Sequence, residues 1–193
     1  YLGFLTPFTV EEAEAGFARV LAGDFTSDER MRLQVDLFRG DEHILRERVF
    51  NDVVVSSAEI SRIATLRAHV DGAFVTAYRA DGLIVSTPSG STAYAMSAGG
   101  PIVMPNTRAL VLAPICPHTL TLRPLVVHGD SLIQLELDQD GPPMVATFDG
   151  QQTADLVFGD RLEIRQAPGR VLLVKAPRDQ FTLLREKLKW GQD

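Results

Sequence analysis

The chain has 193 residues, of which 45% are hydrophobic and 23% are charged, a composition typical of a folded globular protein rather than a disordered one. Its formal net charge of −6 argues against a general nucleic-acid-binding protein, because such proteins carry a basic footprint. The longest apolar stretch, around residues 109–116, is interrupted by Pro114 and falls short of the ~20 residues of a membrane-spanning helix. We therefore expect neither nucleic acid nor a membrane among the partners.

Cysteine usage and the first residue bear on the cellular context. Cys116 is the only cysteine, so a disulfide framework or a thiolate zinc site within one chain is excluded, and a reducing cytoplasm fits best. No secretory signal is seen, but the chain begins at Tyr1 rather than at Met. We therefore expect it to be a fragment of a longer cytoplasmic protein.

The first predicted elements are a helix and a β-hairpin. Apolar residues recur at helical spacing over Val10–Ala22, with Thr9 as a possible N-cap and Gly23 as a stop signal. From Met31 to Leu37 apolar and polar residues alternate, and a second such run follows the Gly40-Asp41 turn. This pattern predicts two antiparallel strands.

Short strand candidates then continue to the end of the chain, separated by turn residues. They cover residues 53–56, 60–70, 72–78, 83–86, 109–113, 125–127, 131–137, 144–148, 161–165 and 171–175. Ten or more strands at roughly ten-residue spacing predict a mainly β (α+β) fold built on a multi-stranded antiparallel domain. We expect one short interior helix at 93–98 and a C-terminal helix at 179–190.

The segment Asp81–Gly100 joins an apolar strand to a run of glycines and small hydroxylated residues. Hydroxyls and close-approaching backbone favour a polar ligand site, although a flexible connection would have a similar composition. Tyr94 could stack on a base or pack in a core, and its small neighbours favour stacking. The segment matches neither the phosphate-binding P-loop nor the dinucleotide-binding Gly-x-Gly-x-x-Gly motif.

Three other places put polar residues at strand ends: Asn51-Asp52, Asp149-Gly150-Gln151 and Pro117-His118. Taken singly, the first two are more often turns, and His118 is more often a hydrogen-bonded structural histidine than a base. A serine hydrolase is disfavoured, because no Gly-x-Ser-x-Gly motif is present and the Ser89-Gly90-Ser91 run lacks the strand-turn-helix frame that would expose a nucleophile.

Taken together, these segments resemble the NAD kinase family. The Asp81–Tyr94 run is similar to that family's signature almost residue for residue. Other segments that resemble family segments are Leu2–Thr6, Ser97–Val103, Ile115–Leu120, Arg123–Leu125, Asp149–Gln151 and Leu184–Gly191. The resemblance covers essentially the whole chain, but only the second part of a family member.

The resemblance implies binding roles for particular residues. Asn51 and Asp52 match an Asn-Glu pair that contacts the adenosine part of NAD, with a carboxylate one methylene shorter. Arg79 and Asp81 match positions at the nicotinamide end, which a neighbouring subunit sometimes supplies. The remaining implied NAD-binding residues are Arg62, Thr92, Ala93, Tyr94, Ser97, Asp149 and Gln151.

The resemblance also implies the organisation and the reaction. Residues 1–25 would be an interdomain link and helix, 26–176 the β-rich NAD-binding domain, and 177–193 a tail helix returning to an α/β domain before Tyr1. That domain would carry a Gly-Gly-Asp-Gly motif with the catalytic aspartate, so we expect no catalytic residue in this chain. The expected reaction is transfer of a phosphoryl group from ATP or polyphosphate to NAD, giving NADP, with Mg or Mn as the divalent metal and a homodimer or homotetramer as the assembly.

Two other functions stay open at this point. Diacylglycerol and sphingosine kinases share the expected fold, but a lipid-binding domain should lack the Thr92-Ala93-Tyr94 segment. A catalytically silent nucleotide-binding or regulatory module is the other alternative, because the expected catalytic motif is not in this chain.

Overall fold

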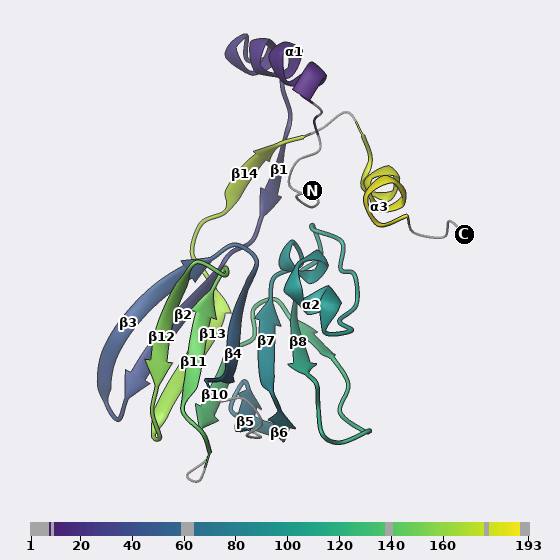
Figure 1. The fold of residues 1–193 in the computed structure, drawn as a ribbon. Helices are drawn as coiled ribbons and strands as arrows, with labels where there is room; N and C mark the ends of the chain where they lie inside the picture. Colours follow the sequence, from purple (N-terminus) through teal and green to yellow (C-terminus); the bar gives the residue numbers. More distant parts are fainter. Residues whose placement is uncertain (1–7, 9, 59–63, 138–140, 176–177, 190–193) are drawn as a thin grey trace. The chain divides into compact units, whose positions relative to one another are not determined.

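The computed structural model describes residue 8 and residues 10–58, 64–137, 141–175 and 178–189. The chain divides into two compact units, one formed by residues 1–30 with 171–193 and the other by residues 31–170 (Figure 1). The expected domain boundaries lay a few residues outside these limits, at 25/26 and 176/177.

The smaller unit contains two helices and a two-stranded sheet. Helix α1 (Val10–Leu21) ends as the sequence predicts, at Gly23, whose positive φ of 73° suits a glycine. Helix α3 (Gln180–Leu188) begins at the N-cap Asp179, whose carboxylate accepts hydrogen bonds from the backbone N–H groups of Phe181 and Thr182. Strands β1 (Ser27–Arg30) and β14 (Val171–Val174) pair antiparallel.

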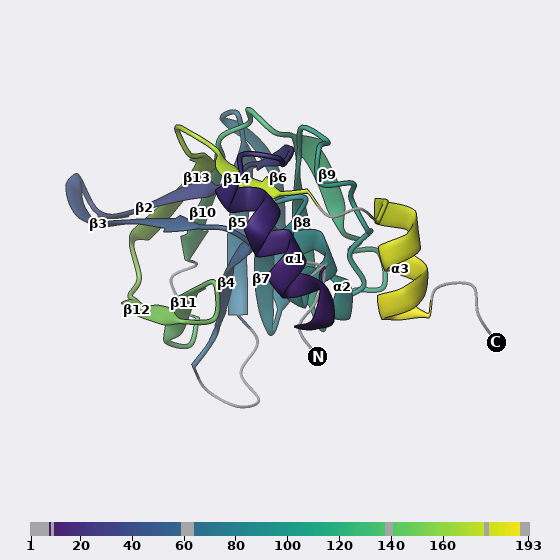
Figure 2. The same cartoon turned by 90° about the horizontal axis from the view of Figure 1, so that it is seen from above.

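The larger unit contains two six-stranded sheets, which form two layers (Figure 2). The first has the order β3-β2-β13-β10-β5-β6, with β2 Leu33–Arg39, β3 Glu42–Val49, β5 Ala64–Val70, β6 Ala73–Ala80, β10 Ile133–Leu137 and β13 Asp160–Gln166. The second has the order β12-β11-β4-β7-β8-β9, with β4 Asp52–Ser57, β7 Gly82–Ser86, β8 Ala109–Ile115, β9 Leu125–His128, β11 Met144–Phe148 and β12 Gln152–Leu156. The pairings between these strands are antiparallel, which confirms the predicted β-rich fold.

One hydrophobic core lies between the two sheets. Leu33 and Val35 of β2 contribute to it from the first sheet, and Val53 and Val55 of β4 from the second. Within each strand the two residues are separated by one position, as expected when alternate side chains of a strand point to the same face. The alternation of apolar and polar residues in the sequence therefore predicts which side chains enter this core.

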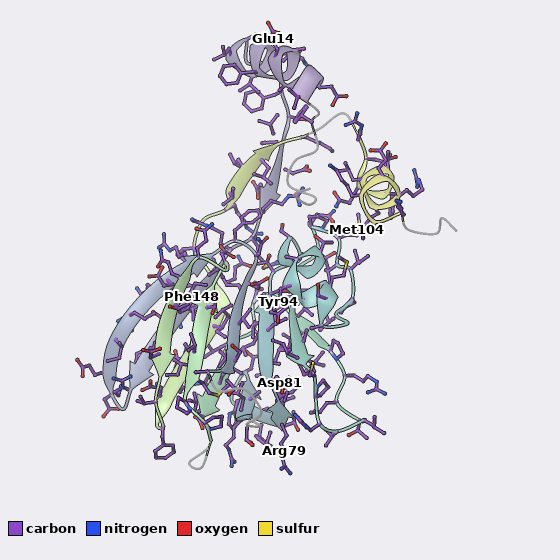
Figure 3. All side chains as sticks on the ribbon, in the orientation of Figure 1. Glu14, Arg79, Asp81, Tyr94, Met104 and Phe148 are labelled. Atoms are coloured by element: carbon purple, nitrogen blue, oxygen red, sulfur yellow. The ribbon has the colours of Figure 1, made fainter. Side chains whose placement is uncertain are left out.

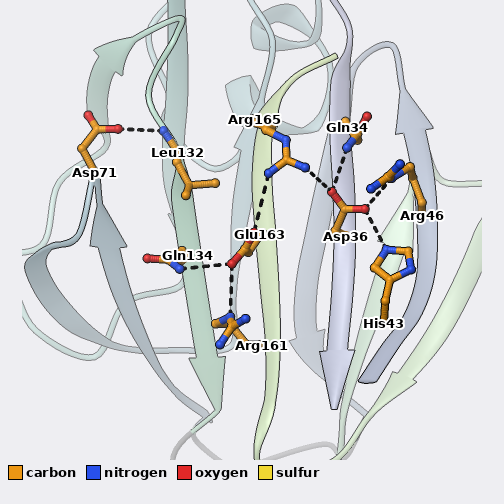
Figure 4. A network of polar contacts seen from close by, with 10 residues as sticks. All are labelled: Gln34, Asp36, His43, Arg46, Asp71, Leu132, Gln134, Arg161, Glu163 and Arg165. Carbon is orange, nitrogen blue, oxygen red and sulfur yellow. Dashed lines mark hydrogen bonds and ion pairs between the residues drawn. The ribbon is translucent and has the colours of Figure 1, made fainter. Parts of the chain in front are cut away.

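The outer face of the first sheet carries a polar network around Asp36 (Figure 4). Its fully buried carboxylate accepts hydrogen bonds from Gln34, Arg46 and Arg165 and lies 2.8 Å from His43 Nε2. Burial acts to raise the pKa of Asp36, but the hydrogen bonds from Arg46, Gln34 and His43 outweigh it and hold the pKa below its usual value.

Helix packing on the outer face of the second sheet involves β7 and β8. The short helix α2 (Tyr94–Ser97) contributes Ala95 to a small apolar cluster with Ile84 of β7 and Val111 and Ala113 of β8. The pocket described below opens over the two neighbouring strands of the same face, β4 and β11.

Candidate functional site

The pocket on this face has a volume of about 400 Å³. Alternate residues of β4 form part of its lining, because side chains two positions apart share a face. The hairpin between β11 and β12 and the start of α2 supply the rest. The lining residues are Asn51, Asp52, Val54, Ser56, Ala93, Tyr94, Thr147, Asp149 and Gly150.

The Asp149-Gly150-Gln151 segment is the hairpin loop between β11 and β12. Asp149 and Gly150 have positive φ, 49° and 67°, and Gln151 N–H donates a hydrogen bond to Phe148 O at 2.9 Å. The Asp149 carboxylate is not free in solvent. It accepts hydrogen bonds from the backbone N–H groups of Phe50 (2.6 Å), Asn51 (2.7 Å) and Asp52 (3.1 Å). The turn is therefore also part of the site.

Thr87, in the loop after β7, binds the other side of the same segment. Its hydroxyl donates to Phe50 O at 2.8 Å and its backbone N–H donates to Asn51 O at 2.8 Å. The hydroxyl also accepts a hydrogen bond from Gly90 N–H at 3.0 Å. Segments far apart in the sequence thus meet at residues 50–52.

Asp52 is a buried carboxylate beside a second carboxylate. Its exposed fraction is 5%, and burial raises its pKa to about 6, with the nearby charge of Asp149 acting in the same direction. Asp52 therefore changes its protonation state close to neutral pH, which is the range in which a carboxylate can both accept and donate hydrogen bonds.

The segment Thr92–Ser97 was predicted to bind the dinucleotide, and only part of it lines this pocket. Ala93 and Tyr94 line it, and the Tyr94 side chain is 48% exposed, which excludes the core alternative. Thr92 is half-buried and its hydroxyl donates to Ser89 O at 3.3 Å. Ser97 is exposed and is not among the lining residues.

Ser91 lies in the 3-10 helix at Gly90–Thr92, between β7 and α2. It is fully buried; its hydroxyl donates to Pro88 O at 2.7 Å and accepts from Val103 N–H at 2.9 Å. Ser91 is therefore a structural residue and not an exposed nucleophile, which agrees with the low weight given to a serine hydrolase.

Arg79 belongs to β6, and Asp81 precedes β7 at the other end of that strand from Thr87 (Figure 3). The backbone carbonyl of Asp81 accepts a hydrogen bond from Ser57 N–H, next to the pocket residue Ser56. Because a strand rises ~3.3 Å per residue, Asp81 is about 20 Å from Thr87 along the chain. Asp81 Oδ1 is 3.5 Å from His118 Nε2, and His118 N–H donates to Arg79 O. One chain therefore does not bring these residues together with Asn51. Arg62 lies outside the described residues, and Gln151 is exposed next to the turn without lining the pocket.

Several residues of the site were not predicted from the sequence. Thr87 was not singled out, although it binds the backbone carbonyls of residues 50 and 51. Ser56 and Thr147 line the pocket, and the signal that could have identified them is their polar character at outward-facing positions of apolar strands. Val54 and Gly150 carry no such signal.

Over the ranges given above, no group of three or more His, Cys, Asp or Glu residues is arranged to hold a metal ion. Within the same ranges, no helix combines the length and the apolar character needed to cross a membrane.

Comparison with known proteins places the chain in a family. Residues 50–176 match the family model of the ATP-NAD kinase C-terminal domain. The chain is 46% identical to the NAD kinase of Geotalea daltonii and 44% identical to that of Syntrophobacter fumaroxidans, and in both cases the match covers 99% of this chain and 68% of the relative.

Solved structures agree with the sequence matches. A yeast NADH kinase in complex with NADH superposes with a TM-score of 0.92 at 29% identity, over 100% of this chain and 59% of that one. An NAD kinase from Archaeoglobus fulgidus in complex with ATP gives a TM-score of 0.75 at 26% identity, over 91% of this chain and 66% of that one. The chain therefore spans about two thirds of the relatives that it matches. It belongs to the NAD kinase family and corresponds to the C-terminal part of its members.

Proposed function

We propose that this chain is the NAD-binding part of an NAD kinase, an enzyme that transfers a phosphoryl group from ATP or polyphosphate to the 2′-hydroxyl of the adenosine ribose of NAD. The observation that carries the proposal is the convergence of Asn51, Asp52, Tyr94 and Asp149, from three distant segments, around one pocket. Family membership supports the same reaction, and neither a lipid kinase nor a silent module is favoured by the relatives' names.

The chemistry of the lining suits a nucleoside. The Asn51 amide and the Asp52 carboxyl supply hydrogen-bonding groups for ribose hydroxyls, and the half-exposed ring of Tyr94 supplies a face on which a base can stack. Thr92, Ser97, Gln151 and Arg62 remain proposed contacts of the dinucleotide. An anionic ligand is compatible with an acidic protein when hydroxyls, backbone amides and a few arginines act locally.

Phosphoryl transfer needs more than this part of the chain offers. The reaction requires in-line positioning, a divalent metal to neutralise the phosphates and a group that orients the nucleophile. Among the described residues no group of three or more His, Cys, Asp or Glu is arranged to hold a metal ion, and the proposed Mg or Mn is assigned to no residue of this chain. We expect the activating aspartate in a Gly-Gly-Asp-Gly motif of the protein's preceding part.

We also propose that the enzyme is a cytoplasmic homodimer or homotetramer. Support for an oligomer comes from the family resemblance of Arg79 and Asp81, which match positions that a neighbouring subunit sometimes supplies in family members. The single cysteine, Cys116, suits a reducing compartment.

The direct test is the reaction of the full-length protein. Purified protein is incubated with NAD and either ATP or polyphosphate, and NADP is quantified with an NADP-specific dehydrogenase. We expect NADP to form with at least one donor, while diacylglycerol and sphingosine remain unphosphorylated in parallel assays. Formation of a lipid phosphate without NADP, or no transfer to any acceptor, would overturn the proposal.

A further inference from the structure

The segment Phe50–Asp52 is the corner at which the chain leaves the first sheet and enters the second. Strand β3 ends at Val49 and β4 begins at Asp52, so the peptide groups between them lie outside the regular pairing of both sheets. Backbone N–H and C=O groups at such a corner need other partners, because an unpaired buried peptide group is costly.

Two residues supply all of these partners. The Asp149 carboxylate accepts from the N–H groups of Phe50, Asn51 and Asp52, and the Asp149 N–H donates to Asp52 O at 3.0 Å. Thr87 donates to the two remaining carbonyls, those of Phe50 and Asn51, through its hydroxyl and its own N–H. The six backbone polar groups of residues 50–52 are therefore bound by Asp149 on one side and by Thr87 on the other.

We infer that Asp149 and Thr87 are positioning residues, which fix the backbone of residues 50–52 and thereby orient the Asn51 side chain for the dinucleotide. The inference rests on the proposed function, because it concerns the same pocket. In this role Asp149 acts through Asn51 and does not itself contact NAD.

The geometry favours this role over direct binding. Three N–H groups within 3.1 Å already surround the two carboxylate oxygens of Asp149. Its negative charge would also repel the phosphates of a dinucleotide unless those N–H groups balanced it. Thr87 is fully buried and is not a lining residue, so it has no access to a ligand in the pocket.

The test compares variants of the full-length protein by NAD titration calorimetry and by the KM for NAD. Asp149→Asn keeps the size of the side chain but replaces one acceptor oxygen with an NH₂ donor, and Thr87→Val removes only the hydroxyl. We expect each to raise the dissociation constant of NAD about tenfold, the cost of roughly one lost hydrogen bond to a charged or buried partner. Thr87→Ser restores the hydroxyl and should restore the affinity to within about twofold of the wild type, by the same principle.

Asp71→Asn is the matched control. Asp71-Gly72 is a second hairpin turn with positive φ at both residues, and the Asp71 carboxylate accepts a backbone hydrogen bond from Leu132 at 2.8 Å (Figure 4). It lies between β5 and β6 in the other sheet and does not line the pocket. We expect it to lower the melting temperature without changing the dissociation constant of NAD.

A double-mutant cycle separates positioning from direct contact. If Asp149 acts through Asn51, then Asp149→Asn should add little to the effect of Asn51→Ala, whereas independent contacts with NAD would add. Amide hydrogen exchange of the ligand-free protein gives a readout that needs no NAD, since exchange at Asn51 and Asp52 should be faster in Asp149→Asn and in Thr87→Val.

The possible results have distinct meanings. Unchanged NAD affinity in Asp149→Asn and Thr87→Val, or additive effects with Asn51→Ala, would overturn the inference while leaving the proposed function intact. A wild-type protein that binds no NAD would overturn both. Should Asp149→Asn fail to fold, the Thr87→Val and Thr87→Ser pair decides, because rescue by serine is expected only if the hydroxyl acts as described.

Discussion

At the scale of single residues, Asp52 stands out because a buried carboxylate lies beside a second one. Burial first, and then the charge of Asp149, raises its pKa to about 6. At pH values between the unfolded pKa of about 3.8 and this folded pKa, Asp52 binds more protons in the folded state than in the unfolded state. The free energy of unfolding therefore falls as the pH rises through that window and stays lower above it.

Asp52→Asn should accordingly stabilise the ligand-free protein at pH 7–8. The gain should approach about 2–3 kcal/mol, the free-energy equivalent of a pKa shift of about 2 units, because the amide cannot ionise. It should fall to about 0.5 kcal/mol near pH 4, where the carboxyl is protonated in the folded state and only partly ionised in the unfolded state. Urea unfolding at both pH values measures it. A gain of equal size at pH 4 and pH 8 would contradict the proposed cause, as would a loss of stability at pH 8.

At the scale of elements, the loop after β7 is packed against the corner at residues 50–52. An added Cβ at Gly90 would lie 2.1 Å from Asn51 O, closer than any real contact, so only glycine allows this approach. Gly90, which in the sequence is compatible with a flexible connection, is here a requirement of close packing.

Gly90→Ala should therefore push the loop away from residue 51. We expect a loss of about 1–3 kcal/mol in the free energy of unfolding, the range for inserting a methyl group into a packed site, together with weaker NAD binding. Gly40→Ala is the control: its φ of 59° also disfavours alanine, but no atom lies within 4 Å of the added Cβ. Equal losses in the two variants, with NAD affinity unchanged in Gly90→Ala, would show that the close approach does not matter.

The elements themselves were predictable where the strands alternate, as in β2, and where a helix has clear end signals, as in α3. Strands β1 and β12 were missed, because Ser-Asp-Glu-Arg and Gln-Thr-Ala-Asp-Leu show little β-branched or apolar alternation. Each forms because a neighbouring strand, β14 or β11, offers it a pairing edge.

The site was predictable in its components but not in its arrangement. Asn51 and Asp149 were singled out as polar residues at strand ends, yet they are 98 positions apart, and no local pattern indicates that they are hydrogen-bonded. Thr87 was missed because a buried threonine that binds a distant backbone looks, in the sequence, like any turn residue. Such contacts follow from the sheet topology, which a single sequence does not specify.

At the scale of the molecule, the pocket belongs entirely to the larger unit, residues 31–170, and overlaps the residues that match the ATP-NAD kinase C-terminal domain. The chain covers about two thirds of the length of its curated relatives, and its proposed role is the recognition of NAD. In that proposal Asn51, held at the corner between the sheets, recognises the dinucleotide.

The most direct measurement of that claim is the dissociation constant of NAD for the full-length wild type, for Asn51→Ala and for Asn106→Ala. Asn106 is an exposed asparagine before β8 that does not line the pocket, so it controls for the substitution itself. We predict at least a ~tenfold weaker affinity for Asn51→Ala, the cost of one or two lost hydrogen bonds, and an unchanged affinity for Asn106→Ala. Equal NAD affinities for all three proteins would contradict the account.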